Sequence, residues 1–447
     1  MTIASAPALE PRESSDKIAP RVHQATLENG MTVLVLPVTK APVVTLQLWY
    51  RVGSRNEILG RTGISHVLEH LMFKGTDKLG PEEFSQVIQE NGGETNAFTS
   101  TDYTTYFETL ASDRLGVALR LEADRMQHLK LAKETFEPER MVVMEERRLR
   151  SVDNPWGALY EETFAGAFRA HPYMWPIIGW MHDIESIDLD DVKHHYGIYY
   201  RPNNVILSIA GKVDPQKTID EVREIFGSIP SGPQPPAVTP IEPQQLGERR
   251  VFVKKEANLP AFVWGYKVPN VNHEDAFALE VLSTLLSSGD SSRLYKSLVI
   301  DKRLVLDIGA DYPLLSIDPG LFTLSAQVLP EKTVEEAEQA LTAELKKLVD
   351  APVGERELLK AKNQIEAEFV FAQDSNFYQA MLLARFELVG GWKKIDEYLP
   401  GIRGVGAADL QRVVKEYLVP DRRTVGVLVP TGAPAKPQAP LPQGMLH

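Results

Sequence analysis

Apolar residues along this chain switch between the spacings that distinguish strands from helices. Runs rich in β-branched and aromatic residues predict strands at 31–37, 43–50 and 205–211. Helical periodicity between and after these runs predicts helices at 63–73, 81–91, 112–128, 138–150, 156–168, 189–200 and 216–226. Thr-rich segments at 94–100 and 103–107 predict a hairpin. This mixture of elements predicts an α+β fold.

The later part of the chain repeats this order of elements. Six prolines and little periodicity mark residues 228–249 as a semi-rigid, Pro-rich linker. Strands at 251–253 and 261–266 and a helix at 276–286 then repeat the opening of the chain. A helix, a proline and a strand close both parts, over 191–211 and over 409–428. We therefore expect two homologous halves: a flexible lead-in over 1–22, a first half over 23–227, the linker over 228–249, a second half over 250–432 and a Pro-rich tail over 433–447.

Composition narrows the class of protein. The 447 residues are 43% hydrophobic and 24% charged, which suits a soluble globular protein of about two to four domains. The net charge of −13 opposes nucleic-acid binding, and the absence of cysteine excludes disulfides, thiol catalysis and thiolate–metal sites. No apolar run reaches the length of a membrane span. We expect a cytoplasmic protein as the sequence is written, or a periplasmic one if a signal peptide has been removed.

The helix at 63–73 carries the strongest candidate chemistry. His66 and His70 lie four residues apart, so both side chains project from one face and can hold one zinc ion. Glu69 stands beside them and can take a proton from water. The order His-x-x-Glu-His is the inverzincin signature. The simpler alternative is an amphipathic helix with a few polar residues.

Two further segments are ambiguous by themselves. Glu139 and Glu146 lie seven residues apart and share a helical face, whereas Glu145 is rotated by about 100° from Glu146. Without other information these acids indicate a solvated face with ion pairs. In the hairpin, the small Ala97 would let another backbone pair with an edge strand, but an ordinary surface hairpin fits equally well.

These segments together resemble one known family. His66–His70, Asn96-Ala97 and Glu139–Glu146 resemble the pitrilysin or insulinase family of zinc peptidases, especially its short bacterial members and the catalytic subunit of mitochondrial processing peptidase. The resemblance extends over about residues 24–430 and includes supporting segments at 121–126, 153–155, 171–173, 176–179 and 200–204. It implies two halves, each a mixed sheet packed by helices, that form a clam-like chamber.

The resemblance also implies roles for the candidate residues. His66, His70 and Glu146 would bind one Zn²⁺ per chain and leave a fourth position open, as a catalytic zinc requires. Glu69 would be the general base that activates water. Glu139 would orient one of the zinc ligands.

The implied substrate is a peptide or an unfolded polypeptide, which an endopeptidase of this kind would hydrolyse. Asn96 and Ala97 would hold its backbone as an added strand. The alternative is a non-catalytic assembly subunit of the same fold. Such subunits typically lose zinc ligands, and all three ligands and Glu69 are retained in this chain.

One departure from the family pattern bears on partners. Active single-subunit members carry an Arg and a Tyr in the second half that reach the substrate. Residues 292–298 match the start of that motif, but Val299 and Leu306 occupy the Arg and Tyr positions. Arg303 or Tyr312 could substitute locally. We expect instead that a homologous sister subunit supplies the pair in a heterodimer, with a homodimer as the alternative.

Overall fold

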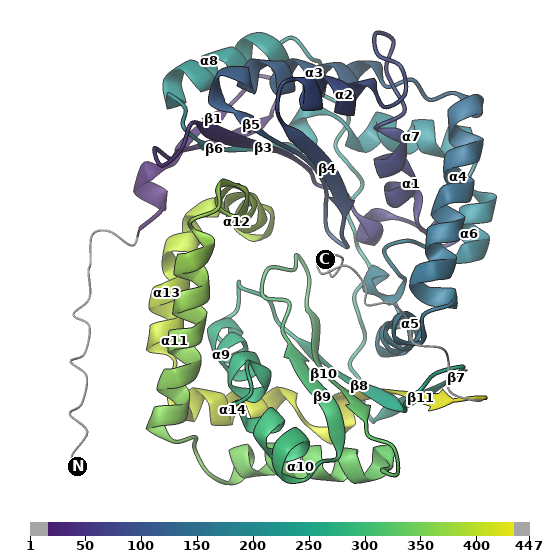
Figure 1. The fold of residues 1–447 in the computed structure, drawn as a ribbon, viewed down its shortest axis with the longest axis vertical. Helices are drawn as coiled ribbons and strands as arrows, with labels where there is room; N and C mark the ends of the chain where they lie inside the picture. Colours follow the sequence, from purple (N-terminus) through teal and green to yellow (C-terminus); the bar gives the residue numbers. More distant parts are fainter. Residues whose placement is uncertain (1–16, 433–447) are drawn as a thin grey trace.

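The computed structural model describes residues 17–432, and it contains two mixed sheets (Figure 1). The six strands of the first sheet lie in the order β1 (His23–Thr26), β2 (Thr32–Pro37), β6 (Val205–Gly211), β3 (Val43–Tyr50), β5 (Thr104–Ala111) and β4 (Glu94–Thr99). Only β2 and β6 run parallel, and every other neighbouring pair is antiparallel. β4 is therefore an edge strand.

The second sheet repeats this topology. Its five strands lie in the order β7 (Arg249–Lys255), β11 (Arg423–Pro430), β8 (Ala261–Val268), β10 (Gly320–Val328) and β9 (Val305–Asp311). β7 and β11 are parallel and the other pairs are antiparallel, so the order matches β2-β6-β3-β5-β4 strand for strand. The prediction of two homologous α/β halves is thus confirmed, with β1 as an addition to the first sheet.

Helices cover both sheets. The first half contains α1 (Ile64–Leu71), α2 (Glu83–Glu90), α3 (Leu115–His128), α4 (Lys133–Arg147), α5 (Pro155–Ala167), α6 (Met181–Ser186), α7 (Leu189–Tyr199) and α8 (Pro215–Phe226). The second half contains α9 (Ala276–Ser287), α10 (Val334–Asp350), α11 (Glu355–Ala372), α12 (Asn376–Val389), α13 (Ile395–Gly404) and α14 (Ala407–Tyr417). No helix within residues 17–432 is long and apolar enough to cross a membrane.

Two helix starts differ from the sequence prediction. α4 begins five residues before Pro138, because burial of Phe136 (1% exposed) draws the preceding turn into the helix. α2 begins at Glu83 rather than at Pro81, since Glu82 has a φ of 65° and interrupts the helical backbone. Proline marks a possible helix start, but packing decides which one is used.

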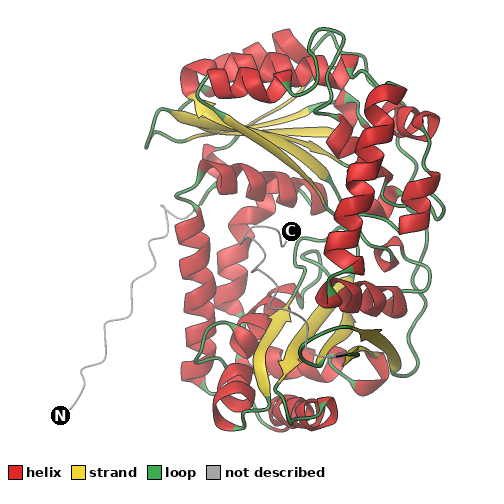
Figure 2. Ribbon diagram, turned by 45° about the vertical axis from the view of Figure 1, so that its right-hand side comes forward, coloured by secondary structure: helices red, strands yellow, loops and turns green. Residues whose placement is uncertain are grey.

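Each sheet is covered on one face by a helix from the other half. α12 lies against β3 and β6, and α5 lies against β7, β8 and β11 (Figures 1 and 2). Both faces of the first sheet are consequently buried: Val33 and Val35 enter the core of the first half, whereas Leu34 and Leu36 join the core of the second. Burial on both faces explains the continuous apolar runs in the sequence.

The two halves can exchange helices in this way because α5 and α12 approach the strands of the opposite sheet closely. A Cβ on Gly426 of β11 would lie 2.0 Å from the Thr163 hydroxyl of α5. At the equivalent strand of the first sheet, Ser208 Oγ donates to the Ala380 carbonyl of α12 (2.8 Å). The two halves are therefore joined through packed helices as well as through the covalent chain.

Part of the predicted lead-in packs against the second half. Ile18, in the predicted lead-in, is buried, and its backbone N–H donates to Asp396 Oδ1 of the second half (2.8 Å). Within residues 230–246, inside the predicted linker, there is no helix or strand. The rest of the lead-in, 1–16, and the predicted tail, 433–447, lie outside the described residues.

Candidate active site

Helix α1 starts at a backbone turn that glycine fits. Gly63 has a φ of 90°, and a Cβ there would lie 2.4 Å from the Ile178 carbonyl oxygen. The Glu57 carboxylate accepts the backbone N–H groups of Gly63 (2.7 Å) and Ser65 (2.8 Å), which have no partner within the helix. Glu57 helps to determine where α1 begins, and no local sequence signal identified it.

α1 and α4 bring three potential metal ligands together. Glu146 Oε2 lies 3.6 Å from His66 Nε2 and 3.4 Å from His70 Nε2, and one ligand atom from each residue lies within 4.8 Å of the others. A tetrahedral zinc ion about 2.0–2.1 Å from each ligand separates neighbouring ligand atoms by about 3.4 Å. The two distances to Glu146 match this separation, and two imidazole nitrogens with one carboxylate oxygen form a ligand set that zinc accepts. Glu145 is exposed and pairs with Arg148 instead (2.7 Å).

Glu139 fixes the orientation of one imidazole. Its Oε1 accepts a hydrogen bond from His70 Nδ1 (2.9 Å), which turns His70 Nε2 toward Glu146 Oε2, 3.4 Å away. Its Oε2 lies 3.1 Å from Lys74 Nζ. Although burial opposes the charge, the bonds to His70 and Lys74 lower the pKa of Glu139. Sequence spacing placed Glu139 on the face of Glu146, but it did not identify Lys74.

The electrostatics of the three residues favour a bound cation. Burial lowers the pKa of His66 to about 3, so its imidazole is neutral and can act as a ligand. Burial also opposes a charge on His70, but bonds to Glu139 and Glu146 outweigh it and raise its pKa to about 9. Despite burial, His70 holds the pKa of Glu146 at about 2, and Arg150 forms an ion pair with Glu146 Oε1 (2.6 Å). Glu139 and Glu146 thus stabilise positive charge beside His70.

Glu69 lies on the same helix and is held by the edge strand. Thr99 Oγ1 of β4 donates a hydrogen bond to Glu69 Oε2 (2.6 Å). Burial raises the pKa of Glu69, although this bond opposes the shift. Thr99 was not singled out in the sequence, and its position in the predicted hairpin was the only available signal. The contact joins the candidate base to the strand expected to bind substrate.

The predicted substrate residues lie on that strand. Asn96 is exposed and Ala97 half-buried on β4, which has β5 as its neighbour within the described sheet. The Asn96 side-chain oxygen accepts the Ala97 N–H (2.9 Å), so a paired peptide would displace this short-range bond. An edge strand is the geometry that strand addition requires.

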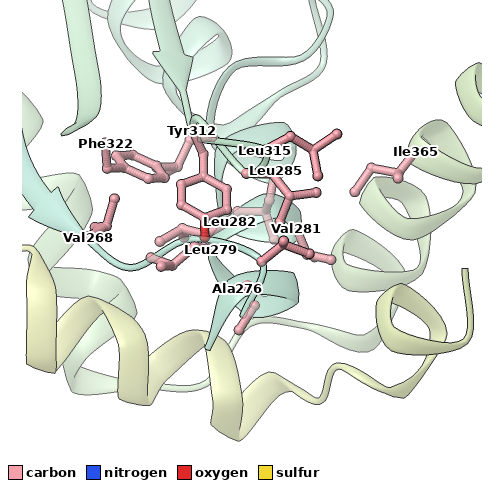
Figure 3. Packing of buried hydrophobic residues seen from close by; sticks show 14 of the residues in the cluster. Val268, Ala276, Leu279, Val281, Leu282, Leu285, Tyr312, Leu315, Phe322 and Ile365 are labelled. Atoms are coloured by element: carbon pink, nitrogen blue, oxygen red, sulfur yellow. The ribbon is translucent and has the colours of Figure 1, made fainter. Parts of the chain in front are cut away.

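The second-half residues at the family's Arg and Tyr positions, and their two candidate substitutes, differ in exposure and in hydrogen bonding. Val299 packs against the second-half core and Leu306 is exposed on β9. Tyr312 lies among buried apolar side chains (Figure 3), and its hydroxyl donates to the Pro269 carbonyl (2.7 Å). This hydroxyl is therefore engaged within the core. Arg303 is exposed in the turn before β9, with a φ of 50°.

Comparison with known proteins supports the same interpretation. The family model described as "Insulinase (Peptidase family M16)" matches residues 33–179, and "Peptidase M16 inactive domain" matches residues 186–365. The zinc protease PqqE of Helicobacter pylori is 36% identical over 415 residues, covering 92% of this chain and 93% of that protein. An uncharacterized zinc protease of Rickettsia bellii is 28% identical and covers 86% of this chain and 92% of its own length.

Solved structures share the fold. The crystal structure of a protease from Helicobacter pylori matches with a TM-score of 0.89 and 36% identity, covering 92% of this chain and 99% of that one. A peptidase M16 inactive domain from Pseudomonas fluorescens matches with a TM-score of 0.81 at 16% identity, covering 93% of this chain and 99% of that one, which supports the fold alone. The sequence matches over both halves and the shared fold together show that this chain belongs to the insulinase family of peptidases, peptidase family M16.

Proposed function

We propose that this chain is the zinc-binding subunit of an endopeptidase that hydrolyses peptides or unfolded polypeptides. One observation supports it most directly: the ligand atoms of His66, His70 and Glu146 converge within 4.8 Å of one another. These residues would hold one Zn²⁺, with Glu139 orienting His70. When bound, zinc lowers the pKa of water and polarises a carbonyl group.

Glu69 would move the proton in this reaction. Its carboxylate takes a proton from the attacking water while the water oxygen bonds to the scissile carbonyl carbon. It then delivers that proton to the leaving nitrogen as the C–N bond breaks. Thr99 would keep the carboxylate in place through its hydrogen bond to Oε2 (2.6 Å).

The substrate backbone would pair with β4 at Asn96 and Ala97. Main-chain hydrogen bonds along an edge strand bind an extended peptide without regard to most side chains. Folded proteins offer few free extended segments, so unfolded chains and short peptides are the expected substrates.

We further propose that full activity needs a homologous partner. Val299 and Leu306 cannot donate hydrogen bonds to a carbonyl oxygen on which negative charge develops. Loss of one such donor typically costs about 10²–10³ in rate. A sister subunit in a heterodimer would restore these donors, and a homodimer would remain feebly active.

Metal content and turnover test the site. His66→Ala and Glu146→Ala should lose most bound zinc, measured by elemental analysis of the purified chain, whereas Glu145→Ala should retain it. Glu69→Gln should retain zinc and fold but lose at least about 10²–10⁴ in cleavage rate of an unfolded peptide. Full zinc in Glu146→Ala, or near wild-type turnover in Glu69→Gln, would contradict the assignment. A wild-type chain without zinc would favour the non-catalytic assembly subunit.

The partner requirement has its own assay. The purified chain is assayed alone on an unfolded peptide and again after addition of a homologous subunit that carries the Arg and Tyr. We expect the rate to rise by at least about 10² upon addition. High activity of the chain alone, unchanged by the partner, would overturn the requirement. Arg303→Ala would then show whether that side chain replaces the missing donor.

A further inference from the structure

A cavity of about 500 Å³ lies beside the end of β4, between the two halves. Phe98, Ser100 and Tyr103 line it from the first half. Helices α9, α11 and α12 and the end of β9 line it from the second half, and Figure 1 shows these three helices to the left of β4. The cavity is thus next to the strand proposed to bind substrate, while the nearby Thr99 contacts Glu69.

The alternation of β4 determines which substrate side chains would reach the cavity. Thr99 points to the face of the sheet that carries Glu69, and Phe98 points to the opposite face, where its ring packs against Trp49 and Tyr103. Successive side chains of a strand point to opposite faces. A peptide paired with β4 would therefore direct every second side chain toward the cavity and the intervening ones toward Glu69.

The charged groups of the cavity are mainly acidic. Glu280, Asp311 and Glu368 contribute three carboxylates, and Arg385 contributes one guanidinium. The hydrogen bond that Glu280 accepts comes from the neutral Tyr398 hydroxyl (3.1 Å). Burial, with the nearby carboxylates, raises the pKa of Glu280 to about 7, and burial also raises that of Asp311. The single guanidinium of Arg385 does not balance the three carboxylates, so an additional cation would be stabilised beside them.

The rest of the wall is apolar and aromatic. Leu314, Leu315, Phe369 and Phe386 surround the acidic groups, and the Tyr312 ring contributes a further face. Apolar walls suit the methylene stem of a lysine or arginine side chain, whose charged end can then reach a carboxylate. Aromatic faces add cation–π attraction. An acidic side chain would meet like charges in the same place.

We propose that this cavity is a specificity subsite that receives a lysine or arginine side chain of the peptide bound along β4, on the face opposite Glu69. The proposal rests on the proposed strand addition at β4. It assigns to the second half, which has no zinc ligands of its own, the selection of substrate.

Binding to the zinc-loaded Glu69→Gln chain tests the subsite without cleavage. A fluorescent, otherwise neutral peptide carries a single lysine, moved one position at a time, and its affinity is measured by anisotropy. We expect lysine to strengthen binding roughly tenfold over leucine at alternate positions, and glutamate to weaken it there. Equal affinity for lysine, leucine and glutamate at every position would overturn the subsite. No binding of any peptide would overturn strand addition itself, and the subsite with it.

Matched variants locate the effect. Adding Glu368→Gln to this chain should reduce the lysine preference, whereas Glu355→Gln, an exposed acid on the same helix α11, should leave it unchanged. Glu280→Gln should abolish most of the preference. Because Glu368 is exposed, its variant is expected to fold even if the variant of the half-buried Glu280 does not. An undiminished lysine preference in a folded Glu368→Gln chain would place the cation elsewhere and overturn the proposal.

Discussion

Replacement of Asp102 by alanine should loosen the contact between the two halves near the candidate active site. Asp102 lies in the turn between β4 and β5 and is 4% exposed. Its Oδ1 accepts the Tyr173 hydroxyl (2.7 Å), and its Oδ2 accepts the backbone N–H of Ile317 (2.9 Å). Ile317 lies between β9 and β10 in the second half. One buried carboxylate thus joins the turn after β4 to the opposite half.

The size of the effect follows from the two donors left behind. A buried donor without an acceptor costs about 1–3 kcal/mol, so two such donors cost about 2–6 kcal/mol. Burial raises the pKa of Asp102, which shows that the carboxylate itself bears a desolvation cost that alanine removes. We therefore expect a loss of about 2–4 kcal/mol in the local opening free energy. At about 1.4 kcal/mol per factor of ten, opening should become about 30- to 1,000-fold more frequent.

Amide hydrogen exchange at Ile317 measures this opening directly. In Asp102→Ala, exchange at Ile317 should accelerate by the factor above, with smaller increases at the turn after β4. Asp113→Ala is the control, because it removes an exposed aspartate just beyond the opposite end of β5. It should leave the exchange rate at Ile317 unchanged. Unchanged exchange at Ile317 in Asp102→Ala, together with unchanged global stability, would refute the claim that this carboxylate couples the halves.

Three further predictions concern other contacts. Glu139→Gln should keep the fold but weaken zinc binding about 10–100-fold in a chelator competition, and an unchanged affinity would remove Glu139 from the support of His70. Glu242 accepts backbone N–H groups at Ala170 and His171, and although burial opposes it, Lys267 and these bonds lower its pKa to about 2. Because the folded pKa is below the unfolded value, its stabilisation is present above about pH 4.5 and is lost as the pH falls toward 2. The urea midpoints of wild type and Glu242→Gln should therefore differ near neutral pH and converge as the pH falls through this range. A difference between the midpoints that stays constant with pH would contradict this prediction. Arg125 is fully buried and bonds Glu122 (Nε–Oε2, 2.7 Å), so Arg125→Ala should lower the free energy of unfolding by about 3–5 kcal/mol, and a loss under 1 kcal/mol would show that the carboxylates find other partners.

Local periodicity determined much of this protein. The spacing of His66 and His70 places both imidazoles on one helical face whatever the rest of the fold does, since 3.6 residues complete a turn. β-branched runs formed strands where the sequence predicted them, and the repeated order of elements predicted the second sheet. Spacing also put Glu139 and Glu146 on one face. These features depend on residues close together along the chain.

Tertiary structure alone decided the features that join distant residues. Thr99 reaches Glu69 because β4 and α1 pack together, and Glu57 determines where α1 starts from six residues before Gly63. The order of elements along the chain did not predict the exchange of α5 and α12, in which each helix buries side chains against the other half's sheet. Hydrophobic burial is non-directional, so an apolar pattern in the sequence predicts that a face of a strand or helix will be buried. The pattern does not predict which element will cover that face. Shape complementarity, as between Gly426 and Thr163, makes that choice.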